Sequence, residues 1–467
     1  MYSLTISGPH FLEMRQLLRP PNGHEPGLLM LLGVADVAAD PWIGEARRKY
    51  VSHSVVPIRK EDVVSSSAHH FEWRKSTFLN LLREAKDSGL AVAFAHSHRA
   101  EIEAYFSKHD DENDFAIAEL ARNSKKSDVD LLSIVLDDND HIVARKCSAT
   151  DKWTSVNQII CQDKAQWRLT VSEGGAINTG AFDRQVIAFG DGFLNSLSQL
   201  RITIVGAGAT GSATAMLLAR HGAHFIAVVD PDYVDLTNIS RLHGANVLDA
   251  ELKTKKVEVL KREIERIGLG TNLLTFDKRC SAPELQDLLR SSDVIFGCSD
   301  DHAGRIFLNR VAYFYNTPVF DMGIGIDPAR NSAGHVQSVD GRLTCIEPGE
   351  VCQLCRGMVD PLIARDEELH IANPEEFQRQ QKEGYVGNFD VKEPAVGYIT
   401  TEVACMAIDE LVCRLTGYRK PVSNRVRKFR LRKDTFPGGQ SKSQCPLCQC
   451  QTHWGRGDMN PFLNRIG

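Results

Sequence analysis

The segment that begins at Arg201 constrains the fold of this chain more than any other stretch. An apolar run at 202–205 leads into the pattern G-x-G-x-x-G, whose glycines are Gly206, Gly208 and Gly211. A run of small residues follows, and a second apolar run at 225–229 ends at Asp230. Strand, glycine turn, helix and strand form a βαβ unit, in which free N–H groups at the start of the helix can bind a phosphate. The sequence therefore predicts an α/β fold with a Rossmann-like, mostly parallel sheet and a nucleotide site at these glycines.

The residues after Asp230 indicate the chemistry of this site. An acidic residue at this position can bind a ribose, as it does in NAD enzymes. The segment that follows also contains Asp232, Asn238, Arg241 and Lys255. Hydride transfer does not need such a set, whereas nucleotidyl transfer must neutralise a triphosphate and the pyrophosphate that leaves. We therefore expect nucleotidyl transfer, and an NAD(P)-dependent dehydrogenase is the alternative.

A third apolar segment, 291–298, is expected to form another buried strand and leads directly to Asp300 and Asp301. Ligands of such folds bind at the carboxyl ends of the strands. Mg²⁺ takes oxygen ligands and bridges phosphates, so a carboxylate at this place suits it. We predict Asp300 as the Mg²⁺ ligand.

Taken together, these motifs resemble the ubiquitin-activating superfamily, which includes the ThiF and MoeB adenylyltransferases. The resemblance covers about residues 180–438 and extends to Cys-Ser-Asp-Asp-x-x-x-Arg-x-x-x-Asn at 298–309. It implies ATP and Mg²⁺ as cofactors. It also implies that the three glycines, Asp230, Asp232 and Asn238 contact the nucleotide and that Arg241 and Lys255 bind its phosphates.

The same resemblance implies a homodimer. Arg184, in the motif Phe-Asp-Arg-Gln, would reach the ATP bound by the partner subunit. We expect a helix over 183–200 to carry it.

Length, charge and hydropathy bound the remaining expectations. A chain of 467 residues is too long for one typical domain. We expect an N-terminal α/β domain at 1–150, a linker at 151–180, the adenylation domain with its crossover loop at 181–438, and a C-terminal tail at 439–467. A net charge of -5 provides no basic field for nucleic acid. Neither a signal peptide nor a long apolar run is evident, so we expect a cytoplasmic protein without a membrane span.

The N-terminal domain carries its own candidate site at His96 and His98. The two histidines follow an apolar strand at i and i+2, so both side chains point to one side of the sheet. Together with Asp110, or with Asp111 in its place, they could bind Zn²⁺ and leave a fourth position open for water. Glu25, just before the first buried strand, could be the general base.

This set resembles the JAMM (JAB/MPN) metalloprotease domain. The resemblance implies that His96, His98 and Asp110 bind zinc, that Glu25 activates water and that Ser107 helps to hold an oxyanion. Two features depart from the family pattern: eight residues instead of seven separate His98 from Ser107, and Arg99 stands where the family has proline. An inactive domain, kept as a scaffold or binding surface, is therefore the alternative.

Two C-x-x-C pairs predict a structural zinc site. Cys352 and Cys355 form the first pair, and Cys445 and Cys448 form the second. Such pairs, far apart in a chain, are typical of closed Cys₄ zinc sites, and they match the zinc knuckle of MoeB-like proteins. Cys450 is a spare thiol that could compete as a ligand. A redox role for the pairs is the alternative.

The fusion of these two parts resembles the activating enzymes of bacterial ubiquitin-like conjugation operons, including the antiviral Bil type. The implied reaction is ATP-dependent adenylation of the C-terminal glycine of a ubiquitin-like protein, with possible transfer to a conjugating enzyme. No cysteine lies between Cys355 and Cys405, so the thioester step lacks a clear nucleophile; the candidates are Cys298, Cys345, Cys405 and Cys450. Activation of a sulfur-carrier protein, as by MoeB or ThiF, is the alternative.

Overall fold

The computed structural model describes residues 1–20, 26–66, 71–98, 103–124, 128–147, 153–171, 179–327, 336, 338–386, 394–430, 433–435 and 448–459. The chain divides into two compact units. Unit 1 comprises Met1–Gly175, Tyr313–Asn316 and His453–Gly467, and unit 2 comprises Ala176–Ala312 and Thr317–Thr452. The main division falls between Gly175 and Ala176, inside the segment expected to be a linker.

Unit 1 is built on a nine-stranded mixed sheet with the order β11-β10-β1-β3-β2-β6-β7-β8-β9. Its strands are β1 (Tyr2–Ile6), β2 (Gly27–Val37), β3 (Arg47–Pro57), β6 (Ala91–Ser97), β7 (Leu131–Leu136), β8 (Ile142–Cys147), β9 (Trp153–Ser155), β10 (Gln158–Cys161) and β11 (Arg168–Val171). The helices are α1 (Gly8–Leu18), α2 (Ser76–Ser88) and α3 (Lys108–Asn123), with a short 3₁₀ turn η1 (Lys60–Asp62). A separate two-stranded sheet pairs β4 (Val63–Ser66) with β5 (Phe71–Trp73).

Both faces of this sheet are buried, as the alternation along β2 shows. Leu28, Met30 and Leu32 belong to the apolar cluster that includes residues of α1. Leu29 and Leu31, between them, belong to the cluster that includes residues of α2 and α3. Successive side chains of a strand point to opposite faces, so an uninterrupted apolar run produces a strand covered on both sides.

The described end of the chain belongs to unit 1 and packs on β2 and β3. His53 Nδ1 lies 2.8 Å from the Trp454 carbonyl oxygen. The Asp458 N–H donates to the Val34 carbonyl at 2.7 Å. A Cβ atom on Gly33 would lie 2.2 Å from the Gly455 carbonyl oxygen. The tail therefore approaches β2 so closely that Gly33 has no room for a side chain.

Unit 2 is built on an eight-stranded sheet with the order β14-β13-β12-β15-β16-β17-β18-β19. The strands are β12 (Arg201–Val205), β13 (Phe225–Val229), β14 (Asn272–Phe276), β15 (Val294–Gly297), β16 (Val319–Asp327), β17 (Ser338–Ile346), β18 (Asn424–Arg430) and β19 (Lys433–Thr435). From β14 to β16 neighbouring strands are parallel, and from β16 to β19 they are antiparallel. The predicted mostly parallel core is thus present, with an antiparallel extension at one edge.

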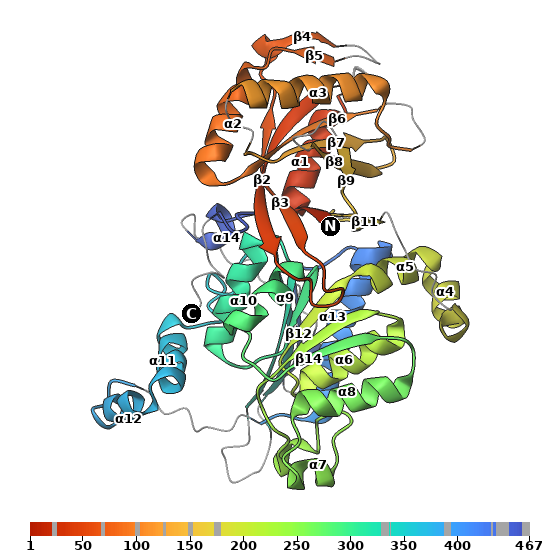
Figure 1. Ribbon diagram of the computed structural model, residues 1–467. Coiled ribbons are helices and arrows are strands. Elements are labelled where there is room, and N and C mark those ends of the chain that lie inside the picture. The colour runs from red at the N-terminus through yellow and green to blue at the C-terminus, as the bar shows by residue number, and fades with distance from the viewer. Residues whose placement is uncertain are drawn as a thin grey trace. The chain divides into compact units, whose positions relative to one another are not determined.

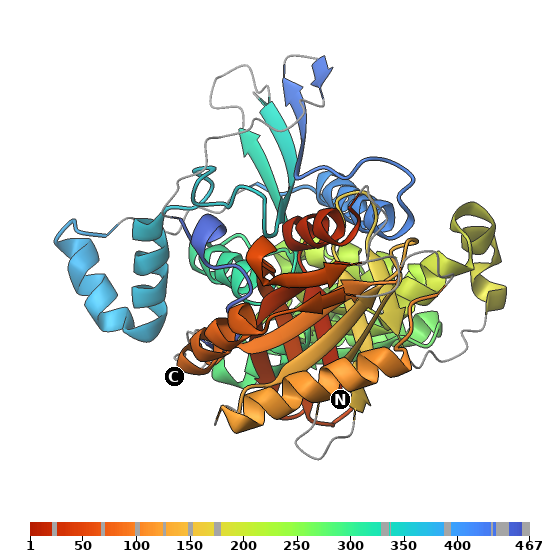
Figure 2. The ribbon, with the colours of Figure 1, turned by 90° about the horizontal axis from the view of Figure 1, so that it is seen from above.

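Unit 2 has helices that lie against this sheet and others that project away from it (Figure 1). They are α4 (Asp183–Phe189), α5 (Asp191–Gln199), α6 (Ala209–His221), α7 (Val247–Glu251), α8 (Lys256–Ile267), α9 (Gln286–Ser291), α10 (His302–Phe314), α11 (Pro361–Ala372), α12 (Pro374–Lys382), α13 (Gly397–Thr416) and α14 (Gln449–Thr452), with 3₁₀ turns η2 (Thr179–Phe182), η3 (Leu236–Asn238) and η4 (Pro283–Leu285). Helix α6 packs against both α8 and α13. Helices α11 and α12 contact each other and stand out as a pair (Figure 2). None of the helices in the described part of the chain is long and apolar enough to cross a membrane.

The single helix predicted over 183–200 is wrong in one respect. Gly190 interrupts it with a φ of 83°, and α4 and α5 lie on either side. Glycine adopts positive φ without the steric penalty of a Cβ, so this residue allows the chain to turn between two helices.

Candidate nucleotide site and candidate metal centres

The glycine loop joins β12 to α6, and each glycine has its own reason to be there. Gly206 has a φ of 96°, and a Cβ on it would lie 2.9 Å from the Cys298 backbone. A Cβ on Gly211 would lie 1.8 Å from the Gly206 carbonyl oxygen. A Cβ on Gly208 would meet no atom within 4 Å. The first and third glycines therefore permit the tight turn, and Gly208 faces open space at the start of α6, where a phosphate would approach.

Asp230 joins this loop to the end of β13. Its side chain is only 6% exposed. One carboxylate oxygen accepts from the Ala207 N–H at 2.6 Å, and the other accepts from the Asp232 N–H at 2.8 Å. Burial raises the pKa of Asp230, although the charge of Lys256 and these two hydrogen bonds oppose the shift. Each carboxylate oxygen has a second lone pair, so Asp230 can still accept from a ribose hydroxyl.

The predicted phosphate-binding residues lie on the segment that follows β13. Lys255 precedes α8, and its ammonium group donates to the Pro231 carbonyl at 2.7 Å and lies 3.7 Å from the centre of the Tyr233 ring. Lys255 is therefore held against the segment that follows Asp230. The Arg241 guanidinium donates to the Thr237 carbonyl at 2.8 Å.

Asn238 and Asp232 have local roles in this segment. The Asn238 side-chain oxygen accepts from the Asp235 N–H at 3.1 Å, which closes a capping box around η3. Asp232 forms an exposed ion pair with Lys256 at 2.8 Å. The structure thus holds Lys255 on the backbone of Pro231, the residue after Asp230, and it places Asn238 and Arg241 on one short turn.

Helix α13 supports this turn. A Cβ on Gly397, the first residue of α13, would lie 3.0 Å from the Ser240 carbonyl oxygen. His243 Nε2 lies 2.8 Å from the Thr401 hydroxyl, and the His243 N–H donates to Ser212 of α6 at 3.1 Å. The loop that contains Arg241 is therefore held between α6 and α13.

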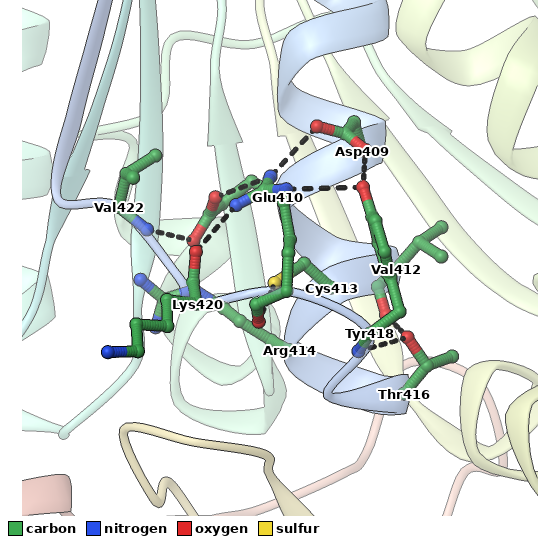
Figure 3. Close-up of polar contacts among 10 residues, drawn as sticks. Asp409, Glu410, Val412, Cys413, Arg414, Thr416, Tyr418, Lys420 and Val422 are labelled. Atoms are coloured by element: carbon green, nitrogen blue, oxygen red, sulfur yellow. Dashed lines mark hydrogen bonds and ion pairs between the residues drawn. The ribbon is translucent and has the colours of Figure 1, made fainter. Parts of the chain in front are cut away.

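A buried ion network holds the other end of α13 (Figure 3). Glu410 accepts from Arg414, from Arg419 and from the Val422 N–H at 2.9 to 3.1 Å. Arg414 also donates to Glu347, beyond β17, at 2.7 Å. Glu410 is fully buried and each of its oxygens has a cationic partner, which is the condition under which a buried carboxylate is tolerated. The network ties α13 to the antiparallel part of the sheet.

Asp300 and Asp301 follow β15 and have different environments. Asp300 is exposed, whereas Asp301 accepts from the Gly304 N–H at 2.9 Å and caps α10. Strands β13, β12 and β15 are neighbours and parallel, so their carboxyl ends meet at one edge of the sheet. The glycine loop, Asp230 and Asp300 all lie at this edge. After β12 the chain continues to β13 on one side, and after β15 it continues to β16 on the other side. Ligands of open α/β sheets bind at such a switch point.

Arg184 is not part of this group within one chain. It is exposed on α4, and its neighbour Gln185 donates to the Arg220 carbonyl at the C-terminal end of α6. Helix α6 has 13 residues and is therefore about 20 Å long. The glycine loop lies at its opposite end, beyond the reach of the Arg184 side chain.

Four cysteine sulfurs of unit 2 lie within 4.8 Å of one another: those of Cys352, Cys355, Cys448 and Cys450. The Cys352 and Cys448 sulfurs are 3.3 Å apart, and those of Cys355 and Cys450 are 3.9 Å apart. A tetrahedral zinc site with Zn–S bonds of 2.3 Å has sulfurs about 3.8 Å apart, so this set fits the ion. Hydrogen bonding between these thiols lowers the pKa of Cys450 and raises that of Cys352, so one proton is shared within the cluster. Cys445, the predicted fourth ligand, lies outside the described residues.

His96, His98 and Asp110 of unit 1 also lie together. His96 Nε2 is 2.8 Å from one Asp110 oxygen, and His98 Nε2 is 3.3 Å from the other. Burial opposes ionisation of Asp110, but hydrogen bonds from both histidines and Ser107 hold the pKa of that carboxyl well below its usual range. Two imidazoles and one carboxylate are a suitable donor set for zinc with an open position.

Ser107, Asp111 and Glu25 are the other residues named for this centre. Ser107 caps α3: its hydroxyl accepts from the Asp110 N–H and donates to Asp110 Oδ2 at 2.7 Å. Asp111 pairs with Arg145 at 2.6 Å, so it is Asp110 that joins the histidines. Glu25, the predicted base, lies outside the described residues.

The candidate thioester cysteines have unsuitable surroundings. Burial raises the pKa of Cys298 and of Cys345, which disfavours their thiolates. Cys405 is exposed on α13, but partial burial raises the pKa of its thiol as well. Cys450 belongs to the four-cysteine cluster.

Sequence reasoning missed two contacts of α10. Glu367 of α11 caps the helix, and Asn309 binds the backbone of Gln353. Asn309 belongs to a recognised motif, and this could have singled it out. Glu367 lies in an ordinary run of acidic residues, where no local pattern distinguishes it from Asp366 or Glu368.

Comparison with known proteins agrees with the geometry of unit 2. The model of the ThiF family matches residues 182–450. Over 143 residues the chain is 32% identical to the adenylyltransferase and sulfurtransferase UBA4 of Meyerozyma guilliermondii, which covers 30% of this chain and 33% of that protein. Over 136 residues it is 26% identical to the sulfur carrier protein ThiS adenylyltransferase of Bacillus subtilis, which covers 29% and 40%.

The chain thus spans less than half the length of either relative. A solved structure of Escherichia coli MccB with MccA-N7isoASN aligns with a TM-score of 0.44 and 15% identity, over 61% of this chain and 77% of that one. The family match includes the glycine loop, both aspartates of the sheet edge and all four clustered cysteines. The chain belongs to the ThiF family.

Proposed function

We propose that unit 2 is an ATP-dependent adenylyltransferase that activates the C-terminal carboxylate of a ubiquitin-like or sulfur-carrier protein. The observation that carries this proposal is the meeting of the glycine loop, Asp230 and Asp300 at the ends of three neighbouring strands. ThiF family membership favours adenylation over hydride transfer. Similar proteins include a sulfur carrier protein adenylyltransferase and a SAMP-activating enzyme.

The proposed reaction needs little from the protein beyond position and charge. The carrier carboxylate attacks the α-phosphorus of ATP, a new carboxyl–phosphorus bond forms, and the bond to the leaving pyrophosphate breaks. A carboxylate is already ionised at neutral pH, so no general base is required. Catalysis then consists of alignment and neutralisation of the charge that develops.

Each residue has a role that its surroundings permit. The open face of Gly208 admits a phosphate, and Asp230 accepts from the ribose while it holds the loop. Lys255 and Arg241 lie on the adjoining segment and bind phosphates. Asp300 is free of side-chain ion pairs in the described part of the chain and would hold Mg²⁺, which supplies charge for the pyrophosphate.

The active form is proposed to be a homodimer. Arg184 cannot reach the glycine loop of its own chain, because α6 separates them. Apolar side chains are exposed both beside it, where Ile187 is 84% exposed, and next to the phosphate-binding turn, where Leu236 and Leu252 are 65% and 68% exposed. An isologous contact that covers both patches would bring Arg184 of each subunit to the other nucleotide site.

The test of the adenylation proposal is ATP–pyrophosphate exchange. The full chain is assayed with candidate carrier proteins encoded by neighbouring genes, alongside variants Asp300→Ala and, as a matched surface control, Glu265→Ala. We expect carrier-dependent exchange in the wild type and the control, and none with Asp300→Ala. Exchange that is equal in all three proteins would refute the assignment of Asp300.

A second part of the proposal concerns the kind of carrier protein that unit 2 activates. We favour a ubiquitin-like protein of a bacterial conjugation system of the antiviral type, with a conjugating enzyme as a further partner. Activation of a sulfur carrier is the alternative, and the absence of a suitably placed cysteine among the described residues favours it. A neighbouring gene for a conjugating enzyme would support the first, and genes for thiamine or molybdopterin synthesis would support the second.

For unit 1 we propose a zinc-dependent hydrolase of the JAMM type. The supporting observation is the contact of His96 and His98 with Asp110. Such a centre could hydrolyse the bond that follows a carrier's terminal glycine. The test is cleavage of a carrier with a C-terminal extension by the wild type and by His96→Ala, each with zinc. We expect cleavage by the wild type alone. No cleavage by either protein would favour the inactive alternative.

A further inference from the structure

Helix α10 begins directly after Asp300 and Asp301, and a distant segment of the chain holds its first turn. The Glu367 carboxylate, on α11, accepts from the His302 N–H at 3.1 Å and from the Ala303 N–H at 2.8 Å. The Asp360 N–H, just before α11, donates to His302 Nδ1 at 2.9 Å. Three hydrogen bonds thus connect the start of α10 to the residues 360–367.

The four-cysteine cluster holds α10 at a second point. Gln353 lies between Cys352 and Cys355, and its N–H donates to the Asn309 side-chain oxygen at 3.2 Å. Asn309 is on α10 and is fully buried, and Gln353 is only 1% exposed. A metal ion that fixed Cys352 and Cys355 would therefore also fix the backbone that binds Asn309. The segment 352–367 runs along α10 from its middle to its start.

These contacts complete the first turn of α10. The first N–H groups of a helix have no partner within it, and an unsatisfied group must find a side chain or water. Glu367 satisfies two of them and Asp301 satisfies the next, at Gly304. A carboxylate also interacts favourably with the positive end of the helix dipole. The position of the turn, and of the Asp300 backbone immediately before it, depends on these two acidic side chains.

We propose that Glu367 is a positioning residue for the adenylation site and that the cysteine cluster anchors the segment that carries it. Glu367 does not touch the nucleotide; it holds the first turn of α10 so that Asp300 presents its carboxylate to Mg²⁺. The inference rests on the proposed function of Asp300. It assigns to the metal of the cysteine cluster a role in the geometry of the nucleotide site, in addition to stability.

Three variants test the role of Glu367. Glu367→Ala removes both acceptors, Glu367→Gln keeps one oxygen without the charge, and Glu368→Ala is the control on the exposed neighbour in the same helix. ATP binding is measured by calorimetry over a series of Mg²⁺ concentrations. We expect the half-saturating Mg²⁺ concentration to rise roughly tenfold in Glu367→Ala, because two charge-assisted hydrogen bonds are lost. Glu367→Gln should lie between it and the wild type, and Glu368→Ala should match the wild type.

Hydrogen exchange gives a readout that does not depend on nucleotide. At a temperature well below the thermal unfolding of either variant, the His302 and Ala303 amides should exchange faster in Glu367→Ala than in Glu368→Ala, whereas amides of unit 2 far from α10 should exchange equally in both. Removal of metal from the wild-type cysteine cluster with a strong chelator should speed exchange in the peptide that contains residues 302–309, and zinc should restore the slow rate.

The outcomes separate this inference from the proposed function. If the wild type binds no ATP at any Mg²⁺ concentration, the proposed function fails, and hydrogen exchange still decides whether Glu367 holds the turn. If the wild type binds ATP and Glu367→Ala shows the same Mg²⁺ dependence and the same amide exchange as Glu368→Ala, the function stands and the positioning role is refuted. Unchanged exchange after metal removal would refute the anchoring role of the cysteine cluster.

Discussion

The candidate nucleotide site of unit 2 and the candidate histidine site of unit 1 are assembled in opposite ways. The residues of the first are spread over the segment from Gly206 to Asp300, and a parallel sheet brings them to one edge. The second takes all three side chains from residues 96–110, and they are buried and already in contact. The comparison shows that residues distant in the sequence need the sheet to bring them to one edge, whereas residues close in the sequence can meet through one strand and one helix.

The largest expected effect is the loss of pyrophosphate exchange when the candidate nucleotide site, but not the histidine site, is changed. Asp300→Ala should lower carrier-dependent pyrophosphate exchange by at least about a hundredfold, since it removes a charge partner of the transition state. Asp301→Ala should cost less, because Asp301 caps α10 and the loss of such a cap typically costs about 1 kcal/mol of stability. His96→Ala should leave exchange unchanged. Loss of exchange in His96→Ala would mean that the two sites do not act independently.

A second prediction compares the two candidate metal centres. Four thiolates close a zinc site, whereas two imidazoles and a carboxylate leave a position open to exchange. Metal analysis should find one zinc that survives mild chelation and a second that is lost. In Cys450→Ser the retained zinc should become labile.

The matched control is Cys445→Ser. If that variant loses its zinc while Cys450→Ser keeps it, the fourth ligand is the one predicted from the C-x-x-C pattern. Failure to find any zinc in a variant without the cysteine cluster but with His96 intact would leave only the inactive alternative for unit 1.

A third prediction concerns whether one subunit supplies all the residues of each site. The histidine site has all its ligands in one chain, whereas the nucleotide site is proposed to need Arg184 from a partner. Arg184→Ala and Lys255→Ala should each be inactive. Co-expressed as heterodimers they should regain part of the activity, because one of the two sites then has both wild-type residues. Heterodimers that form and stay inactive would show that Arg184 acts within its own chain or not at all.

The smallest effect concerns the pH dependence of stability. Burial raises the pKa of Asp230, so its contribution favours the folded state below the ordinary carboxyl range and is lost as pH rises through the raised pKa. The pKa of Asp110 is depressed, so its contribution is present above that range and is lost on acidification. From about pH 4.5 to about pH 8, the stability of wild type relative to Asp230→Asn should fall. Urea unfolding at both pH values measures this; a rise would contradict the sign of the shift.

Local pattern predicted much of this structure, for identifiable physical reasons. The strands at 202–205 and 225–229 follow from short apolar runs, and the turn at Gly206 follows because glycine adopts a positive φ without a steric penalty. The pairing of His96 with His98 follows from the two-residue period of a strand. That Asp110 and not Asp111 joins them depends on where α3 starts, and Ser107 determines this as its cap.

Long-range contacts were not predictable in the same way. The choice of Glu367 over its acidic neighbours depends on the docking of α11 beside α10. The contact of Cys450 with the other three thiols requires the path of the chain after residue 448. In each case a residue of ordinary type acquires its role from a partner far away in the sequence.

The fate of ATP labelled at the α-phosphorus is the most direct test of whether unit 2 adenylates a carrier protein. The full chain is incubated with Mg²⁺, ATP labelled at the α-phosphorus and a candidate carrier, and the products are separated. The account predicts that the label appears as an adenylate on the carrier's C-terminal carboxylate and, after hydrolysis, as AMP, with release of pyrophosphate. Formation of ADP and phosphate instead, or labelling that is unaffected by removal of the carrier's terminal glycine, would contradict it.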